Sequence, residues 1–173
     1  LNKRFNAILM FRAPLDHAQS LLSQHRNFVD QQKADDFILS YMNWLGHHEF
    51  GLNHKYFNIY ERNNYSKNAD KNELNFWLKV WINYYSYVTE IYDPAQNLFL
   101  IHYDDLAKEP NELKKAIEIK IKKKLNTDLV NPYKNNKALN KNSIEVNDKQ
   151  LLKAEEIYRQ LILNKIKIKE YNN

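Results

Sequence analysis

The 173-residue chain contains no cysteine. This absence excludes disulfide bonds, thiol catalysis and zinc sites built from cysteine. It also suits a reducing compartment, and we expect a cytoplasmic location for the chain.

Glycine is nearly absent as well, with only Gly46 and Gly51. The loops that wrap nucleotide phosphates with backbone N–H groups, G-x-x-x-x-G-K-[ST] and G-x-G-x-x-G, need several glycines at close spacing. Neither pattern occurs. A glycine-rich phosphate loop is therefore excluded from this chain.

Long apolar runs are missing too. The longest stretches fall short of the ~18 residues that a membrane-spanning helix requires, so we expect no membrane span. The first residues are too polar and the first apolar run too short for a signal peptide. The chain does not begin with methionine and starts almost on its first predicted strand. We therefore expect it to be a piece of a longer protein.

The chain does contain enough apolar material for a core. Hydrophobic residues make up 43% of the sequence and aromatic residues 13%, and the length predicts a single domain over residues 1–173. The net charge of +5 favours an anionic partner. Much of this charge is local, because lysines crowd the stretch 114–124.

Two strand-to-helix corners organise the predicted fold. Residues 5–11 form a short apolar run that predicts a buried strand, and Pro14 then forces a turn before a helix that runs to about Val29. Residues 97–103 repeat the pattern, with a helix that starts around Pro110. Two such corners indicate a parallel sheet, and the fold class is a helix-rich α/β protein with a small parallel sheet.

The remaining pattern is helical. The stretch 72–92 carries Trp77 and Trp81 on an apolar stripe that we expect to be core. Residues 113–121 fit either a strand or a helix, and the flanking lysines favour a helix. Further helices are predicted at 35–45, ended by Gly46, and at 148–162; polar loops are predicted at 63–72 and 127–147.

The first candidate site is Arg12, which directly follows the first strand, together with Ser20 eight residues later. Ligands of open parallel sheets bind beyond the carboxyl ends of the strands. The planar guanidinium matches phosphate oxygens, and a serine on the next helix can face the same anion. The alternative is an arginine paired with a surface carboxylate.

These residues also carry a family resemblance. Arg-x-Pro-x-Asp-x-x-x-Ser after an apolar strand resembles the 3'-phosphate-binding segment of sulfotransferases that use 3'-phosphoadenosine 5'-phosphosulfate (PAPS). The resemblance implies that Arg12 and Ser20 hold the 3'-phosphate. Residues 97–106 resemble the family strand that ends in Tyr-Glu-Asp-Leu, with Asp104 in place of glutamate, which implies that Tyr103 lies near the adenine.

The resemblance implies the later portion of a P-loop-type sulfotransferase domain. Such enzymes transfer a sulfuryl group from PAPS to a hydroxyl or amine of a small-molecule, lipid or carbohydrate acceptor. The family's phosphosulfate loop and catalytic base lie upstream of the arginine strand. We therefore assign no catalytic residue to this chain and expect it to be inactive alone.

Other readings stay open. His47, His48, Glu49 and His54 could bind a metal, line a substrate pocket or serve the structure, and they lack a typical ligand spacing. The lysine-rich stretch could bind nucleic acid, although a solvated helix face is commoner and we expect no nucleic-acid partner. A non-catalytic interaction domain is a third reading. An exposed sheet edge predicts self-association into homo-oligomers.

Overall fold

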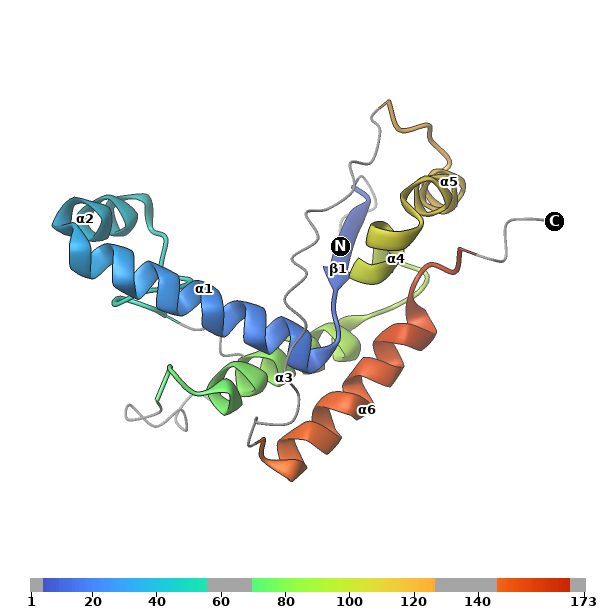
Figure 1. Cartoon of the computed structure of the whole chain (residues 1–173). Helices are drawn as coiled ribbons and strands as arrows, with labels where there is room; N and C mark the ends of the chain where they lie inside the picture. Colours follow the sequence, from blue (N-terminus) through green and yellow to red (C-terminus); the bar gives the residue numbers. More distant parts are fainter. Residues whose placement is uncertain (1–4, 56–69, 127–145, 169–173) are drawn as a thin grey trace. The chain divides into compact units, whose positions relative to one another are not determined.

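The computed structural model describes residues 5–55, 70–126 and 146–168. Helices dominate this part of the chain (Figure 1). Its strands form one small parallel sheet, so the predicted helix-rich α/β class is confirmed. The loops predicted at 63–72 and 127–147 lie mostly outside the described residues. The elements are β1 (Ala7–Phe11), α1 (Pro14–Ala34), α2 (Asp36–Leu45), α3 (Leu74–Ile91), β2 (Leu98–His102), α4 (Tyr103–Lys108), α5 (Pro110–Ile121) and α6 (Asp148–Asn164).

The chain divides into two compact units. The strand unit comprises residues 1–12, 89–139 and 158–173, and the helical unit comprises residues 13–88 and 140–157. Each unit is described by itself below. That residues 1–173 form one partial domain stays a prediction.

The sheet of the strand unit pairs β1 with β2 in parallel, as predicted, with Ala7 opposite Leu98 and Phe11 opposite His102. β2 is almost fully buried, whereas Ile8 and Met10 of β1 are 47% and 44% exposed. The prediction that the first strand is buried is therefore wrong for one of its faces. Side chains alternate along a strand, and within the described residues only one face of β1 packs on the core.

The core of the strand unit joins β2 to α5 and to the segment after α6. Its buried members are Ile101, Leu113, Ala116, Ile117 and Ile166. Three of them follow the helical spacing of α5, which confirms the predicted helix. Ile119, which a strand would have buried beside its alternate neighbours, is 51% exposed.

The helical unit is centred on α3. Trp77 and Trp81 are each 1% exposed, which confirms that this aromatic stripe is core. α1 extends to Ala34, beyond the predicted end near Val29. The extra turn buries Gln32 to 2% exposure, a polar side chain that the apolar periodicity could not place in the core.

α2 has the boundaries that its sequence predicts. The Asp35 side chain accepts a hydrogen bond from the N–H of Phe37 at 2.8 Å, and Gly46 ends the helix with a left-handed φ of 74°. Figure 1 shows α2 beside the carboxyl-terminal half of α1. None of its ten residues is buried, and Trp44 is 80% exposed.

Candidate functional site

The strand unit brings two of the predicted site residues together. Phe11 and His102 are paired in the sheet, so Arg12 and Tyr103 follow them at the same carboxyl edge. The guanidinium carbon of Arg12 lies 4.6 Å from the centroid of the Tyr103 ring. This is cation–π geometry, and it places a fixed positive charge beside an aromatic face.

His102 fixes the end of β2 beneath Tyr103. Its Nδ1 accepts a hydrogen bond from the Asp104 N–H at 3.1 Å, and its Nε2 lies 2.9 Å from the Tyr158 hydroxyl. Burial lowers the pKa of His102, although the Asp104 and Asp105 carboxylates oppose this shift. The neutral ring then carries its hydrogen on Nε2 and donates it to Tyr158, because Nδ1 is an acceptor.

The short helix α4 was not foreseen from the sequence. Tyr103 was expected to end the strand, and it instead opens this helix. The signal was present in His102, whose ring accepts from the backbone of the first turn, and in Asp104 and Asp105, whose charges suit a helix start. Asp105 also forms an ion pair with Lys165, which ties α4 to the segment after α6.

The strand-end arginine was also open to a plainer explanation, pairing with a surface carboxylate. Among the described residues Arg12 belongs to none of the ion pairs. The side chain is half-buried at the sheet edge, and its observed neighbour is the Tyr103 ring. Its N–H donors are therefore not committed to a carboxylate in this part of the chain.

Ser20 lies in the other unit. It is an exposed residue of α1, on the helix that follows Arg12 along the chain. Its role beside Arg12 stays a prediction. His17, which precedes it on α1, has its ring 6.0 Å from that of Tyr85 within the helical unit.

The four-residue histidine and glutamate group does not assemble into one cluster. His47 and Glu49 form an exposed pair at 3.4 Å, and a backbone hydrogen bond lowers the pKa of Glu49 with help from His47. His54 is buried instead, with its ring 5.0 Å from Trp77. Within the described ranges no three His, Cys, Asp or Glu residues could hold a metal ion together.

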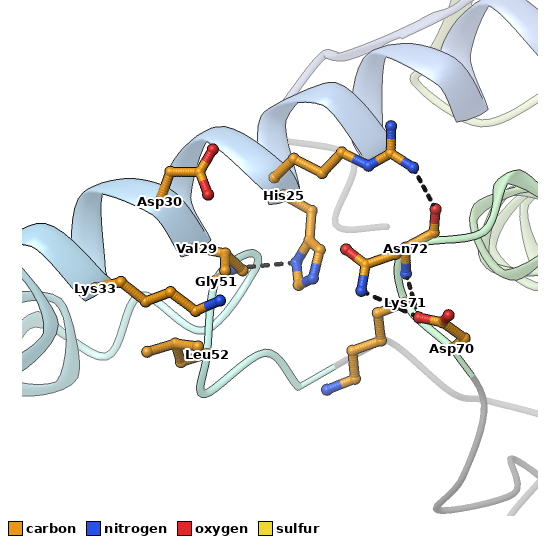
Figure 2. Close-up of a pocket in the computed structure, with 10 residues that line it drawn as sticks. His25, Val29, Asp30, Lys33, Gly51, Leu52, Asp70, Lys71 and Asn72 are labelled. Atoms are coloured by element: carbon orange, nitrogen blue, oxygen red, sulfur yellow. Dashed lines mark hydrogen bonds between the residues drawn. The ribbon is translucent and has the colours of Figure 1, made fainter.

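A second candidate site, a pocket in the helical unit, was missed by the sequence reasoning. Its volume is about 570 Å³, within the range of small-molecule sites. Its lining comes from α1, the turn at Gly51 and the segment before α3 (Figure 2). Only the spacing of Arg26, Val29, Asp30 and Lys33 on one face of α1 hinted at it.

Comparisons with protein-family models, curated proteins and solved structures give no match for the chain. None of the helices in the described ranges combines the length and the apolar character needed to cross a membrane. Function is therefore inferred from the residues and their geometry.

Proposed function

We propose that the chain is part of a sulfotransferase-like protein and that its strand edge binds the adenosine end of PAPS. Arg12 would hold the 3'-phosphate, Tyr103 would border the adenine, and the Ser20 hydroxyl would donate to a phosphate oxygen. The proposed domain is of the P-loop sulfotransferase type. A cytoplasmic location belongs to the same proposal, on the ground that the chain has no cysteine.

The observation that carries the proposal is the pairing of Arg12 with Tyr103. Two residues taken from separate sequence motifs lie at one edge of a parallel sheet, with the guanidinium 4.6 Å from the ring centroid. The carboxyl edge of parallel strands is where such folds bind nucleotides. A guanidinium and an aromatic face are the two groups that a phosphorylated purine nucleoside needs.

The proposed reaction separates binding from transfer. An acceptor oxygen or nitrogen would attack the sulfur of PAPS and lose its proton to a base. The bond from sulfur to the 5'-phosphate oxygen would break, and 3'-phosphoadenosine 5'-phosphate (PAP) would leave. In the family that the sequence resembles, the groups that assist this step lie upstream of the arginine strand. The residues described here would supply only nucleotide binding, so transfer by this chain alone is not expected.

Calorimetric titration with PAP and with adenosine 5'-phosphate tests the assignment. The two nucleotides differ only in the 3'-phosphate. We expect PAP to bind more tightly, and Arg12→Ala to weaken PAP about tenfold or more, because an ionic hydrogen-bonded pair is lost. Arg12→Lys should recover part of the affinity, since a lysine keeps the charge but cannot form the bidentate fork.

A matched control removes an arginine elsewhere. Arg159→Ala takes the same charge from an exposed position of α6 and should leave the preference for PAP intact. Equal binding of the two nucleotides, or equal losses in the two arginine variants, would contradict the assignment of Arg12. A random oligonucleotide that binds with no nucleotide preference and with strong salt dependence would favour the basic-surface alternative instead.

A non-catalytic interaction domain is the alternative that a specific observation favours. Phe37, Tyr41 and Trp44 lie on one side of α2 and are 67%, 48% and 80% exposed. Exposed aromatic groups of this kind mark many interaction sites. Sedimentation of the intact chain and of Trp44→Ala tests this alternative. If α2 is an interaction surface, Trp44→Ala should reduce the association of the chain, whereas nucleotide binding should be unchanged.

A further inference from the structure

The pocket of the helical unit collects positive charge from two parts of the chain. Arg26 and Lys33 come from α1, and Lys71 comes from the segment before α3. Asp30 and Asp70 also line it, so the charged residues sum to +1. Val29 and Leu52 add apolar surface. Figure 2 shows the Lys33 side chain extending toward the turn at Gly51.

One wall of the pocket is the turn at Gly51, and it is built rigidly. The Gly51 N–H donates to Nδ1 of His25 at 3.1 Å, and the Leu52 N–H donates to the Gln32 side chain at 2.7 Å. Gly51 has a φ of 86°, and a Cβ there would collide with Gln32. Two buried side chains of α1 therefore hold this turn, and the wall does not need a ligand in order to form.

Hydrogen bonds also hold the opposite wall of the pocket. Arg26 donates to the Asn72 carbonyl at 2.6 Å, and the Trp77 indole donates to the Lys71 carbonyl at 2.8 Å. One oxygen of Asp70 accepts from the backbone and side-chain amides of Asn72 at 2.8 and 3.1 Å. The Asp70 carboxylate is thus occupied locally.

The lysine side chains of the pocket can still donate hydrogen bonds to a ligand. Lys71 donates to the His54 carbonyl at 3.2 Å, which uses one of its three ammonium hydrogens. Among the described residues, the Lys33 side chain takes part in none of the ion pairs or hydrogen bonds. Burial lowers the pKa of His25, and the charges of Lys71 and Arg26, which line the same pocket, lower it further.

We propose that this pocket binds a small organic oxyanion, a molecule that carries a carboxylate or phosphate on a body of roughly sugar size. The oxyanion contacts Lys33, Lys71 and the free edge of the Arg26 guanidinium. The body packs on Val29 and Leu52. This pocket belongs to the helical unit and the proposed nucleotide edge to the strand unit, and the pocket proposal is independent of the proposed function.

Three probes of similar size test the charge requirement: glucose 6-phosphate, glucuronate and neutral glucose. The readout is the NMR resonance of the Trp77 indole N–H, because that group is bonded to the Lys71 backbone. Trp77→Phe assigns the resonance. We expect saturable shifts with one or both anions and none with glucose, and the stronger anion identifies phosphate or carboxylate as the natural group.

Variants then locate the site. Lys33→Gln and Lys71→Gln should each weaken the bound anion about tenfold, because each removes one ionic hydrogen bond. The matched control is Lys55→Gln, an exposed lysine of the same unit outside the pocket, which should change affinity less than twofold. Lys33→Gln also keeps the test independent of folding, since it breaks no bond among the described residues.

Several outcomes would overturn the proposal. Shifts with glucose equal to those with the anions would show that charge is irrelevant. Equal losses in Lys33→Gln and Lys55→Gln would show general attraction to a basic protein. No saturable shift with either anion would reject the site outright. Arg12→Ala should bind the anions normally, so a failed nucleotide assignment leaves this result unaffected.

Discussion

α2 and α3 are both aromatic helices of the helical unit, but their aromatic side chains differ in exposure. Trp44 of α2 is 80% exposed, whereas Trp77 of α3 is 1% exposed. Both helices place aromatic side chains at helical spacing, and both were predicted as helices from that pattern. The comparison shows that aromatic periodicity predicts the helix and one apolar face, but not what that face contacts.

The difference lies in what surrounds each stripe. Trp77 packs against the rings of His25, Phe50, His54 and Phe76, with centroids between 5.0 and 5.7 Å apart, and its indole N–H has a carbonyl partner. The aromatic groups of α2 stack mainly on each other, with Tyr41 between Phe37 and Trp44. α2 is held instead by its cap and by Met42, whose sulfur accepts from Gln32 at 3.1 Å.

The largest expected effect comes from the buried helix. Trp77→Ala should lower the free energy of unfolding by about 3–5 kcal/mol, because it leaves a cavity and an unpaired Lys71 carbonyl. Trp44→Ala is the matched change on α2. Urea unfolding compares the two variants with the parent chain, and similar losses would show that the burial contrast carries no energetic weight.

Acidification should weaken the same buried cluster. Burial, with a smaller contribution from Lys71, lowers the pKa of His54 from 6.5 to about 4, and it lowers the pKa of His25 as well. The unfolded chain therefore binds more protons below pH 6.5, and stability falls as the pH drops from 6.5 toward 4. For His54 the loss should reach roughly 2–3 kcal/mol.

The control for this pH effect is His54→Gln, which cannot titrate. Urea unfolding at pH 7 and pH 4.5 should show a smaller pH-dependent loss in the variant than in the parent. An unchanged loss would assign the acid sensitivity to other groups.

The two glycines of the helical unit provide a second comparison, between an open and a crowded position. Both have positive φ, but an added Cβ meets nothing within 4 Å at Gly46, whereas at Gly51 it collides with Gln32. Gly46→Ala should cost about 1 kcal/mol from backbone strain alone. Gly51→Ala should cost about 1–3 kcal/mol more, from overpacking against a buried side chain. Thermal unfolding of both variants measures the two stability losses, and equal losses would contradict a collision at Gly51.

The smallest stability effect belongs to α2. Trp44→Ala should change the free energy of unfolding by no more than about 0.5 kcal/mol, because the side chain is largely in water. Analytical ultracentrifugation of the same variant tests whether the exposed face of α2 takes part in self-association. A loss above 1 kcal/mol at micromolar concentration that disappears on dilution would show that α2 is covered by a second molecule.

The sequence predicted those features that depend on local pattern. The helical spacing of Leu113, Ala116 and Ile117 identified α5, and two strand-to-helix corners gave the parallel pairing of β1 and β2. That pairing also placed Arg12 next to Tyr103, since equivalent ends of parallel strands meet at one edge. These predictions succeed because burial on one face leaves a regular trace along the chain.

Features built from distant side chains left no such trace. The pocket is lined by Arg26 of α1 and by Lys71, which are far apart in the sequence, and Arg26 donates to the neighbouring Asn72 carbonyl. The exposure of one face of β1 and of α2 also could not be predicted, because an apolar pattern looks the same whether or not another element covers it. α4 differs from these features, because its capping residue, His102, is visible in the sequence. The short helix was nevertheless overlooked.

The division of the strand unit has a consequence for how the protein is made. Its sheet pairs β1 with β2, yet most of the helical unit is encoded between them. During synthesis β1 therefore leaves the ribosome several seconds before its partner, at ordinary elongation rates. Throughout that interval the five-residue apolar strand β1 lacks its partner β2, while the intervening helices can already fold. An apolar strand that waits for its partner is prone to aggregate, so this interval is when the chain most needs the protection of a chaperone.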